Sequence, residues 1–419
     1  PFFKRSENHA QVDMMDKGYH GDSGELGVTL PTRFKTPFVS GFIAACAAIG
    51  IPPTTDYNGA KQEGASVVHS TIENGKRASG ATAFLKPVLK RSNLTTITHA
   101  QVGKLILEGK KVVGVQYIKD KKTVRVNAGK EVILSAGAFQ SPQLLMLSGI
   151  GDASELNIHG IECLHELKGV GKNLQDHLFF PICEQSKTQE GVNHNIPPLQ
   201  QLKAAWNYFV NKKGVFNSGP LEGMAFLDLD QNGGKVNFQL HFSPMWLGKE
   251  NGYDAYDLNT FPSSDGFTIF PTLLHPKSRG SVSLSSADPS DVPVIQPNFL
   301  EEKEDLEQLV KGGKLVFKIM EQQALKKHTK ANGVPLNRTS EEALVEHIKK
   351  TVETVYHPVG TCKMGNDPLA VVDSTLKVHG IENLRVVDAS IMPKIVSGNT
   401  NAPVYMIAEK AADMILTAT

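Results

Sequence analysis

Two polar residues near the C-terminus have the side-chain types needed to remove a proton from an alcohol. His357 lies in the run Val355–Gly365 (VYHPVGTCKMG), and Asn399 lies in Val396–Pro403 (VSGNTNAP). A neutral imidazole is the natural base for a hydroxyl proton near pH 7, and a carboxamide can hydrogen-bond to the same substrate oxygen. Such a pair suits an enzyme that takes a proton and a hydride from an alcohol, provided that another group accepts the hydride.

The composition is typical of an ordinary globular protein without a charge excess. The 419 residues are enough for two domain-sized cores. Lys and Arg number 44 against 43 Asp and Glu, so there is no electrostatic case for a nucleic-acid partner. No apolar run approaches the roughly 18 residues that a membrane-spanning helix needs. The sequence therefore favours a soluble protein, cytoplasmic or membrane-peripheral in preference to secreted, and leaves the compartment open.

The cysteines and the first residues give two further expectations. The four cysteines are widely spaced without a C-x-x-C pair, which favours reduced thiols and predicts no metal site. They are Cys46, Cys163, Cys183 and Cys362. The chain starts with Pro1, its first methionine is Met14, and Pro1–Asn8 is typical of the middle of a helix. We therefore expect a fragment or a processed chain.

The first part of the chain predicts two helices followed by a β-meander. The helices are expected at Phe38–Gly50 and around Gly80–Lys90. Five short β-rich runs follow, separated by turn signals: Leu94–Ala100, Val102–Leu107, Val112–Ile118, Thr123–Val126 and Glu131–Leu134. The last run predicts a buried strand, followed by a turn of small residues and a helix over Ser141–Leu147. Folds of the α/β class use this arrangement to bring a ligand close to backbone amides.

The pattern changes in the middle of the chain and returns near its end. From about Cys183 to Thr354, polar loops, strand-like runs and amphipathic helices predict an α+β domain. After Tyr356 the pattern is α/β again, with a strand over Leu384–Ser390 and a closing helix over Asn401–Leu416. We expect a discontinuous α/β domain of residues 1–180 and 355–419, with residues 181–354 forming the other domain.

Several of these runs resemble the signatures of the glucose–methanol–choline (GMC) flavin oxidoreductases. Ser135–Gly151 (SAGAFQSPQLLMLSGIG) is similar to the second signature of the family, and Gly169–His177 (GVGKNLQDH) to another of its runs. Tyr356–Cys362 and Val378–Pro393, continuing through Ala402–Pro403, resemble the C-terminal catalytic and flavin-binding block. The order and spacing match along nearly the whole chain. Choline dehydrogenase-like and animal glucose dehydrogenase-like members are the most similar.

The resemblance implies an α/β FAD-binding domain, Rossmann-like, with an α+β substrate-binding domain. One departure is large, because the family's opening strand, its G-x-G-x-x-G loop and its Gly-Gly-Ser-Ser-type loop are absent. The nearest pattern, Gly149-x-Gly151, follows a helix instead of a strand. Relative to the family, roughly a hundred N-terminal residues are missing, about one or two βαβ units. We therefore expect an incomplete FAD-binding domain that binds FAD poorly by itself, with the missing segment as a candidate partner.

The resemblance also assigns roles around the flavin. His357 accepts the alcohol proton as the hydride leaves for flavin N5, and Asn399, which cannot act as a base, is the second polar group. The alternative for Asn399 is a turn residue. The expected flavin contacts are Val102, whose backbone holds the adenine, together with Ala136, Gly137, Asp388, Ala389, Asn401, Ala402 and Pro403. The alternatives are a core valine at Val102, a packing turn at Ala136 and Gly137, and an N-cap aspartate at Asp388.

Substrate contacts are expected from the middle of the chain. Glu222 matches a pocket-facing glutamate of choline-oxidising relatives, and a carboxylate with aromatic walls suits a quaternary ammonium. The same glutamate is common among relatives that act on neutral alcohols, so it does not establish choline. Trp246 and Phe270 are candidate wall residues, with core or surface packing as the alternative. His177, beside Asp176, is interpreted as structural.

The sequence therefore predicts an FAD-dependent alcohol dehydrogenase or oxidase that forms an aldehyde or a ketone. One alternative is a family member with other flavin chemistry, such as oxygen-using oxidation or light-driven decarboxylation. The other is a cofactor-free fragment or binding module. The alcohol and the electron acceptor, whether a quinone, a dye or O₂, remain open.

Overall fold

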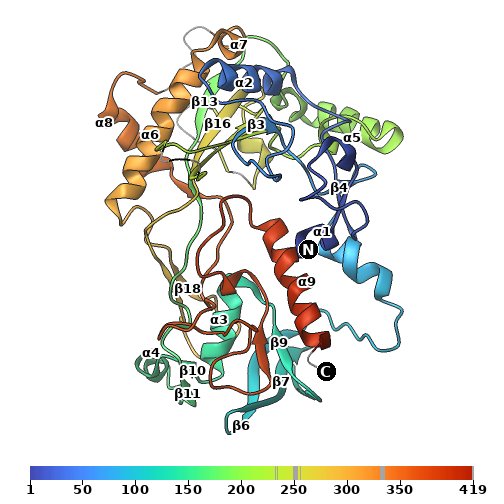
Figure 1. Cartoon of the computed structure of the whole chain (residues 1–419), viewed down its shortest axis with the longest axis vertical. Coiled ribbons are helices and arrows are strands. Elements are labelled where there is room, and N and C mark those ends of the chain that lie inside the picture. The colour runs from blue at the N-terminus through green and yellow to red at the C-terminus, as the bar shows by residue number, and fades with distance from the viewer. Residues whose placement is uncertain (232, 234, 249–252, 255, 331–335, 418–419) are drawn as a thin grey trace.

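The computed structural model describes residues 1–231, 233, 235–248, 253–254, 256–330 and 336–417. Figure 1 shows a large sheet with its helices toward one end of the molecule and a smaller α/β unit toward the other. The C-terminal helix α9 (Asn401–Thr417) starts between them and runs along the smaller unit. Both sheets and helices are therefore present in each part. None of the described helices combines the length and the apolar character needed to cross a bilayer.

The large sheet is antiparallel and has the order β19-β12-β16-β15-β14-β3, with β13 also paired to β16. Its strands are β3 (Gly64–Val67), β12 (Leu178–Phe179), β13 (Ile182–Gln185), β14 (Gly223–Leu227), β15 (Phe238–Ser243), β16 (Gly266–Leu273) and β19 (Glu353–Thr354). Nearly every residue of the three central strands is buried. Most residues of these strands are apolar, as burial on both faces favours, but β15 and β16 also bury polar side chains such as Gln239, His241 and Thr272.

Helices cover this sheet and complete its core. The helix α2 (Pro37–Ala48) packs on β3, β14 and β15, and α6 (Lys303–Met320) packs on β16. Their partners are α7 (Gln323–Lys326), against α2, and α8 (Glu341–Thr351), against α6. The core therefore joins residues 38–65 to residues 178–348, although the predicted division assigned residues 1–180 to the other domain.

The smaller unit contains the predicted meander and the predicted strand–turn–helix. The meander is β6 (Gln101–Glu108), β7 (Lys111–Lys119) and β8 (Lys122–Asn127). Next, β9 (Val132–Leu134) pairs in parallel with β20 (Leu384–Val386), and α3 (Gly137–Leu147) follows β9. Shorter elements complete it: β10 (Ile150–Gly151), α4 (Ala153–Ile158) and β11 (His165–Glu166).

One predicted element is absent, and another differs in type. Leu94–Ala100 is not a strand, since its residues are mostly exposed and the first ladder begins at Gln101; strand propensity without a pairing partner forms no sheet. The helix expected around Gly80–Lys90 is present, but as a π-helix over Ala81–Leu85 followed by a 3₁₀ helix over Lys86–Val88 instead of a regular α-helix. Pro87 interrupts regular helical hydrogen bonding there. The four cysteines form no disulfide, as predicted.

The first residues are fixed to the rest of the chain by polar contacts. The helix α1 (Phe2–Ser6) packs on α9, and β1 (Glu7–His9) pairs in parallel with β2 (Leu26–Val28). The buried His20 ring lies between two carboxylates, with Nδ1 3.0 Å from Glu7 Oε2 and Nε2 3.0 Å from Asp56 Oδ1. Burial opposes protonation of this ring, but the hydrogen bonds and charges of the two carboxylates outweigh it and raise the pKa of His20 to about 9.

The His20 cluster predicts a pH-dependent part of the stability. Since the folded-state pKa lies above the ordinary value of 6.5, the protonated ring stabilises the fold fully below about pH 6.5, and this contribution is lost as the pH rises through about 9. We expect the stability difference between wild type and His20→Gln to shrink steadily from pH 6.5 to 9.5 in denaturant titrations. A constant difference across that range would contradict the ionised ring.

A second prediction concerns the contact between α6 and the sheet. A Cβ added at Gly312 would lie 2.1 Å from Cζ of Phe238, a side chain that is fully buried on β15. We expect Gly312→Ala to lower the free energy of unfolding by about 1–3 kcal/mol, since overpacking outweighs the helix preference for alanine. Gly129→Ala, where a Cβ meets nothing within 4 Å, is the control and is expected to change stability little.

Candidate active site

The two residues predicted to act on an alcohol lie side by side. His357 follows β19, Asn399 precedes α9, and the Nε2 of His357 is 3.4 Å from the Nδ2 of Asn399. The Oδ1 of Asn399 accepts a hydrogen bond from Nε2 of Gln239 on β15, at 3.2 Å. The large sheet therefore orients the carboxamide so that its NH₂ group faces the imidazole.

A chain of hydrogen bonds fixes which nitrogen of His357 carries its proton. The Nε2 of His177 lies 3.0 Å from the carbonyl oxygen of Val396, and a carbonyl only accepts, so this nitrogen carries the hydrogen. A neutral His177 then has a bare Nδ1, which lies 3.0 Å from Nδ1 of His357. The hydrogen of His357 must therefore be on Nδ1, which leaves the lone pair of Nε2 facing Asn399.

This assignment requires neutral imidazoles, and burial supplies them. Burial lowers the pKa of His357 to about 4. Burial, and next the charge that His357 can carry, lower the pKa of His177 to about 3. An imidazole without a nearby carboxylate partner gives up its proton when it loses contact with water. Near pH 7 both rings are neutral, and His357 can accept a proton at Nε2.

The backbone of His357 is held by an acid. The Oδ1 of Asp176 accepts a hydrogen bond from the His357 backbone N–H at 2.9 Å, and Thr354 donates its hydroxyl to the other carboxylate oxygen. Burial raises the pKa of Asp176 to about 6, against the effect of these hydrogen bonds. The carboxylate is thus mainly ionised at pH 7 and fixes the segment that follows β19.

The central strand β15 presents two polar side chains to this place. Gln239 and His241 are buried, and Nδ1 of His241 lies 2.9 Å from the hydroxyl of Thr272. Among the residues that the structure describes, Nε2 of His241 and Oε1 of Gln239 have no hydrogen-bond partner. Burial, and next the charge of His357, lower the pKa of His241 to about 3. Buried polar atoms without partners indicate a place where a polar ligand can complete the hydrogen bonding.

The end of β9 and the end of β20 meet through Asp388. Its buried carboxylate accepts hydrogen bonds from the Gly137 backbone N–H at 2.9 Å, from the Ser141 hydroxyl at 2.5 Å and from the Ser390 backbone N–H at 2.8 Å. Gly137 has φ +85°, and a Cβ there would meet nothing within 4 Å. Ala136 is exposed beside it. The strand end is thus open to a group that approaches the backbone closely.

The other expected flavin contacts occupy three further places. Asn401, Ala402 and Pro403 form the first turn of α9, directly after Asn399, and the first two are exposed. Helix N-termini present unpaired N–H groups to polar ligands. Val102 lies on β6 opposite Tyr117, and Ala389 begins the 3₁₀ turn after Asp388. The open glycine, the free first turn of α9 and the orphaned polar atoms on β15 fit a flavin cofactor.

The expected substrate contacts make other bonds. The buried carboxylate of Glu222 accepts hydrogen bonds from Thr36, from its backbone N–H at 3.0 Å and its hydroxyl at 2.6 Å, at the start of α2. Burial raises the pKa of Glu222, against these hydrogen bonds. Trp246 is buried, and its indole N–H has no partner among the described residues. Phe270 packs edge-on against Phe179. No hydrogen bond of these side chains reaches His357 or Asn399 in the described structure, and their substrate role stays a prediction.

Sequence reasoning missed part of this site. His177, interpreted as structural, contacts the ring of His357 directly, and Asp176 beside it holds the same segment. A usable signal existed on β15 (FQLHFS), where Gln239 and His241 alternate with apolar residues. Side chains at i and i+2 share one face of a strand, and polar pairs on a buried face indicate a lined site.

Comparison with known proteins identifies the family. Sequence patterns of GMC oxidoreductases match residues 1–179 and 276–408. Alcohol dehydrogenase [acceptor] of Pseudomonas putida is 42% identical over 99% of this chain and 74% of its own. Oxygen-dependent choline dehydrogenase of Brucella anthropi (strain ATCC 49188) is 38% identical over the same shares of the two chains. A formate oxidase variant of Aspergillus oryzae RIB40, whose structure addresses FAD modification, has a TM-score of 0.89 and 27% identity, over 100% of this chain and 77% of its own.

The chain belongs to the GMC oxidoreductase family. It is therefore an FAD-dependent oxidoreductase, which confirms the predicted family, enzyme class and cofactor. The FAD-binding fold of the family is also confirmed in outline, as a mixture of sheets and helices.

The hydrogen-bond chain predicts a measurable tautomer. In the FAD-loaded protein with ¹⁵N-labelled histidine, we expect His357 to show a protonated Nδ1 and a bare Nε2 at pH 7, since His177 can only accept at its Nδ1. His177→Phe removes the acceptor, so the His357 hydrogen is expected to redistribute toward Nε2. A protonated Nε2 in the wild type would contradict the assignment.

Proposed function

We propose that this chain oxidises a small-molecule alcohol to an aldehyde or a ketone, with His357 as the base and Asn399 as its polar partner. The observation that supports this most is the chain of hydrogen bonds through His177, which leaves the lone pair of His357 Nε2 next to the NH₂ group of Asn399. A donor and an acceptor side by side match an alcohol oxygen and its hydrogen.

The two side chains divide the work on one hydroxyl group. The Nε2 of His357 accepts the hydroxyl proton, and the Nδ2 of Asn399 donates a hydrogen bond to the same oxygen. Gln239 keeps the Asn399 carboxamide in the orientation that this requires. Bound FAD supplies the acceptor for the hydride that leaves the alcohol carbon.

The buried setting defines when His357 can act. With a pKa of about 4 in the protein without ligand, the ring carries no proton of its own across the neutral range. The proton that it accepts from the alcohol is held in a place with little water, so a nearby negative charge would favour its uptake. Asp176, bonded to the His357 backbone, is an ionised group beside this segment.

The FAD is proposed to lie against the open strand ends of a Rossmann-like domain. Ala136 and Gly137 allow close approach, and Asp388, with Ala389, holds this turn in place. The first turn of α9, at Asn401–Pro403, is proposed to face the flavin ring, since it follows Asn399 directly. The backbone of Val102 is proposed to hold the adenine.

The substrate is proposed to bind against the face of the large sheet that carries Gln239 and His241. We assign residues 1–180 and 355–419 to the FAD-binding domain and 181–354 to the substrate domain, with α2 and β3 contributing to the core of the latter. Glu222 and Trp246 are proposed to line the substrate space. Because Thr36 already satisfies the Glu222 carboxylate, a direct role of Glu222 requires a substrate that competes for these hydrogen bonds.

Replacement of the base tests the proposed function. In the FAD-loaded protein, we expect His357→Gln to slow reduction of the flavin by a reacting alcohol by about 10²–10⁴-fold, since a general base contributes on that scale. In the wild type, protonation of His357 itself is not expected to slow this reduction above about pH 5, because the pKa of His357 lies near 4; a decrease near pH 6 is expected only from protonation of Asp176. Stopped-flow absorbance measures both.

A matched histidine provides the control. His347 is half-buried and its Nε2 contacts the carbonyl oxygen of Pro181, away from the site, so His347→Gln is expected to leave the rate unchanged. Equal rates for wild type and His357→Gln, with FAD bound in both, would exclude His357 as the base. A fall of the rate with an apparent pKa near 6.5 that persists in Asp176→Asn would contradict the lowered pKa of His357.

A further inference from the structure

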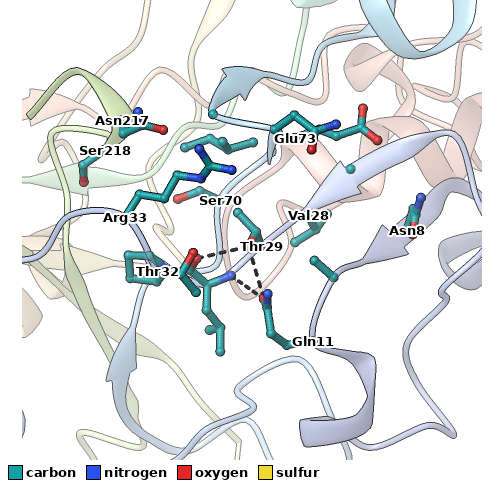
Figure 2. A pocket seen from close by; sticks show the side chains of 17 residues that line it. Asn8, Gln11, Val28, Thr29, Thr32, Arg33, Ser70, Glu73, Asn217 and Ser218 are labelled. Atoms are coloured by element: carbon teal, nitrogen blue, oxygen red, sulfur yellow. Dashed lines mark hydrogen bonds between the residues drawn. The ribbon is translucent and has the colours of Figure 1, made fainter. Parts of the chain in front are cut away.

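A second cavity lies away from the candidate active site. It has a volume of about 310 Å³ and lies between β2, the strand β4 (Ile72–Glu73) with the turn residues Asn74 and Gly75 that follow it, and the end of the 3₁₀ turn Val215–Asn217 (Figure 2). None of the residues placed at the candidate active site lines it. A volume of this size accommodates a small organic molecule.

The unusual feature of this cavity is Asn217. Its side chain is more than nine-tenths buried, and neither Nδ2 nor Oδ1 has a hydrogen-bond partner among the residues that the structure describes. Its backbone is fixed by a bond to the Gly214 carbonyl oxygen. A buried carboxamide without partners costs free energy, so a group that binds its donor and its acceptor would be stabilised here.

Arg33 lies next to this carboxamide. The point that a Cβ at Gly75 would occupy is 2.8 Å from Oδ1 of Asn217 and 3.4 Å from Nη1 of Arg33, so both side chains converge on one place. Figure 2 shows Arg33, Asn217 and Ser218 on the same side of the cavity. The guanidinium makes one hydrogen bond, to the Lys212 carbonyl oxygen at 3.3 Å, and it forms no ion pair in the described structure. Its remaining N–H groups are available for a carboxylate.

The cavity also has an acidic member. Glu73 lines it, and the described residues offer this carboxylate no ion pair. Its side chain lies across β2, since a Cβ at Gly27 would be 2.7 Å from its Cβ. The hydrogen bonds of Gln11, which accepts from the Thr29 hydroxyl at 3.2 Å and from the Leu30 N–H at 2.9 Å, hold the loop between these groups (Figure 2).

We propose that this cavity binds a small zwitterion of the amino-acid class. Its carboxylate would pair with Arg33 and accept a hydrogen bond from Nδ2 of Asn217, while its cationic group would lie toward Glu73. A dicarboxylate would bring a second negative charge to Glu73, and a neutral molecule would leave Arg33 unpaired. The side chains of Arg33 and Glu73 are exposed, so water weakens their attraction for the ligand. The buried Asn217 therefore provides the hydrogen bonds that orient the ligand. Binding here does not depend on which alcohol is oxidised.

Calorimetric titration of the FAD-loaded protein tests this with three probes of similar length. We expect 4-aminobutyrate to bind at least ten-fold more tightly than butyramide and than succinate. Arg33→Gln and Asn217→Leu are each expected to weaken 4-aminobutyrate binding by ten-fold or more. Glu73→Gln should reduce the preference for 4-aminobutyrate over succinate.

Controls separate this binding from other effects. Arg125→Gln, an exposed arginine on β8 outside the cavity, is expected to leave the affinity unchanged, and so is His357→Gln at the candidate active site. The melting temperature of Asn217→Leu should stay within a few degrees of wild type, because the carboxamide that is removed makes no hydrogen bonds in the described structure. If Asn217→Leu does not fold, the binding measurements on Arg33→Gln test the proposal. Absence of binding, equal binding of butyramide, or affinity unaffected by Arg33→Gln would overturn the proposal.

Discussion

The contact between the two imidazoles of His177 and His357 is the interaction on which the site depends. The two Nδ1 atoms lie 3.0 Å apart, so only one of them can carry a hydrogen, which it donates to the other. Burial keeps both rings neutral. The carbonyl of Val396 breaks the symmetry between them, since it accepts from His177 alone. One backbone oxygen thus determines that Nε2 of His357 is free to accept a proton.

The large sheet supplies the second half of the site. Its central strand β15 carries Gln239, which orients Asn399, and His241, which lies beside it. These polar side chains lie on one face of the strand, while Phe238, Leu240 and Phe242 on its other face pack into the core and hold the strand in place. The same sheet receives α2 and β3 from the first part of the chain, so the site is built on a core that crosses the predicted domain boundary.

The smaller unit contributes the exposed turn at the end of β9, where other groups can approach the backbone. The carboxylate of Asp388 joins the end of β20 to the start of α3, and this bond leaves Gly137 and Ala136 free on the outside. An N-cap aspartate and a cofactor-supporting aspartate are therefore compatible interpretations of one side chain, because the carboxylate fixes the turn whose backbone faces outward. The comparison with GMC oxidoreductases gives the protein its cofactor, FAD, which we propose to lie against this turn.

The sequence by itself determined the family, the meander and most of the long helices, because these depend on local patterns and on motifs that remain intact along the chain. It also singled out His357 and Asn399 as the candidate residues, whose roles stay a proposal. It did not determine that Leu94–Ala100 lacks a strand partner, that Glu222 binds Thr36, or that His177 bonds to His357. Those are contacts between residues far apart in the chain, and a side chain's partner depends on which segments the core brings together. Only the tertiary structure decided which nitrogen of His357 carries no hydrogen. That follows from the carbonyl oxygen of Val396, 39 positions away in the sequence, which acts on His357 through His177.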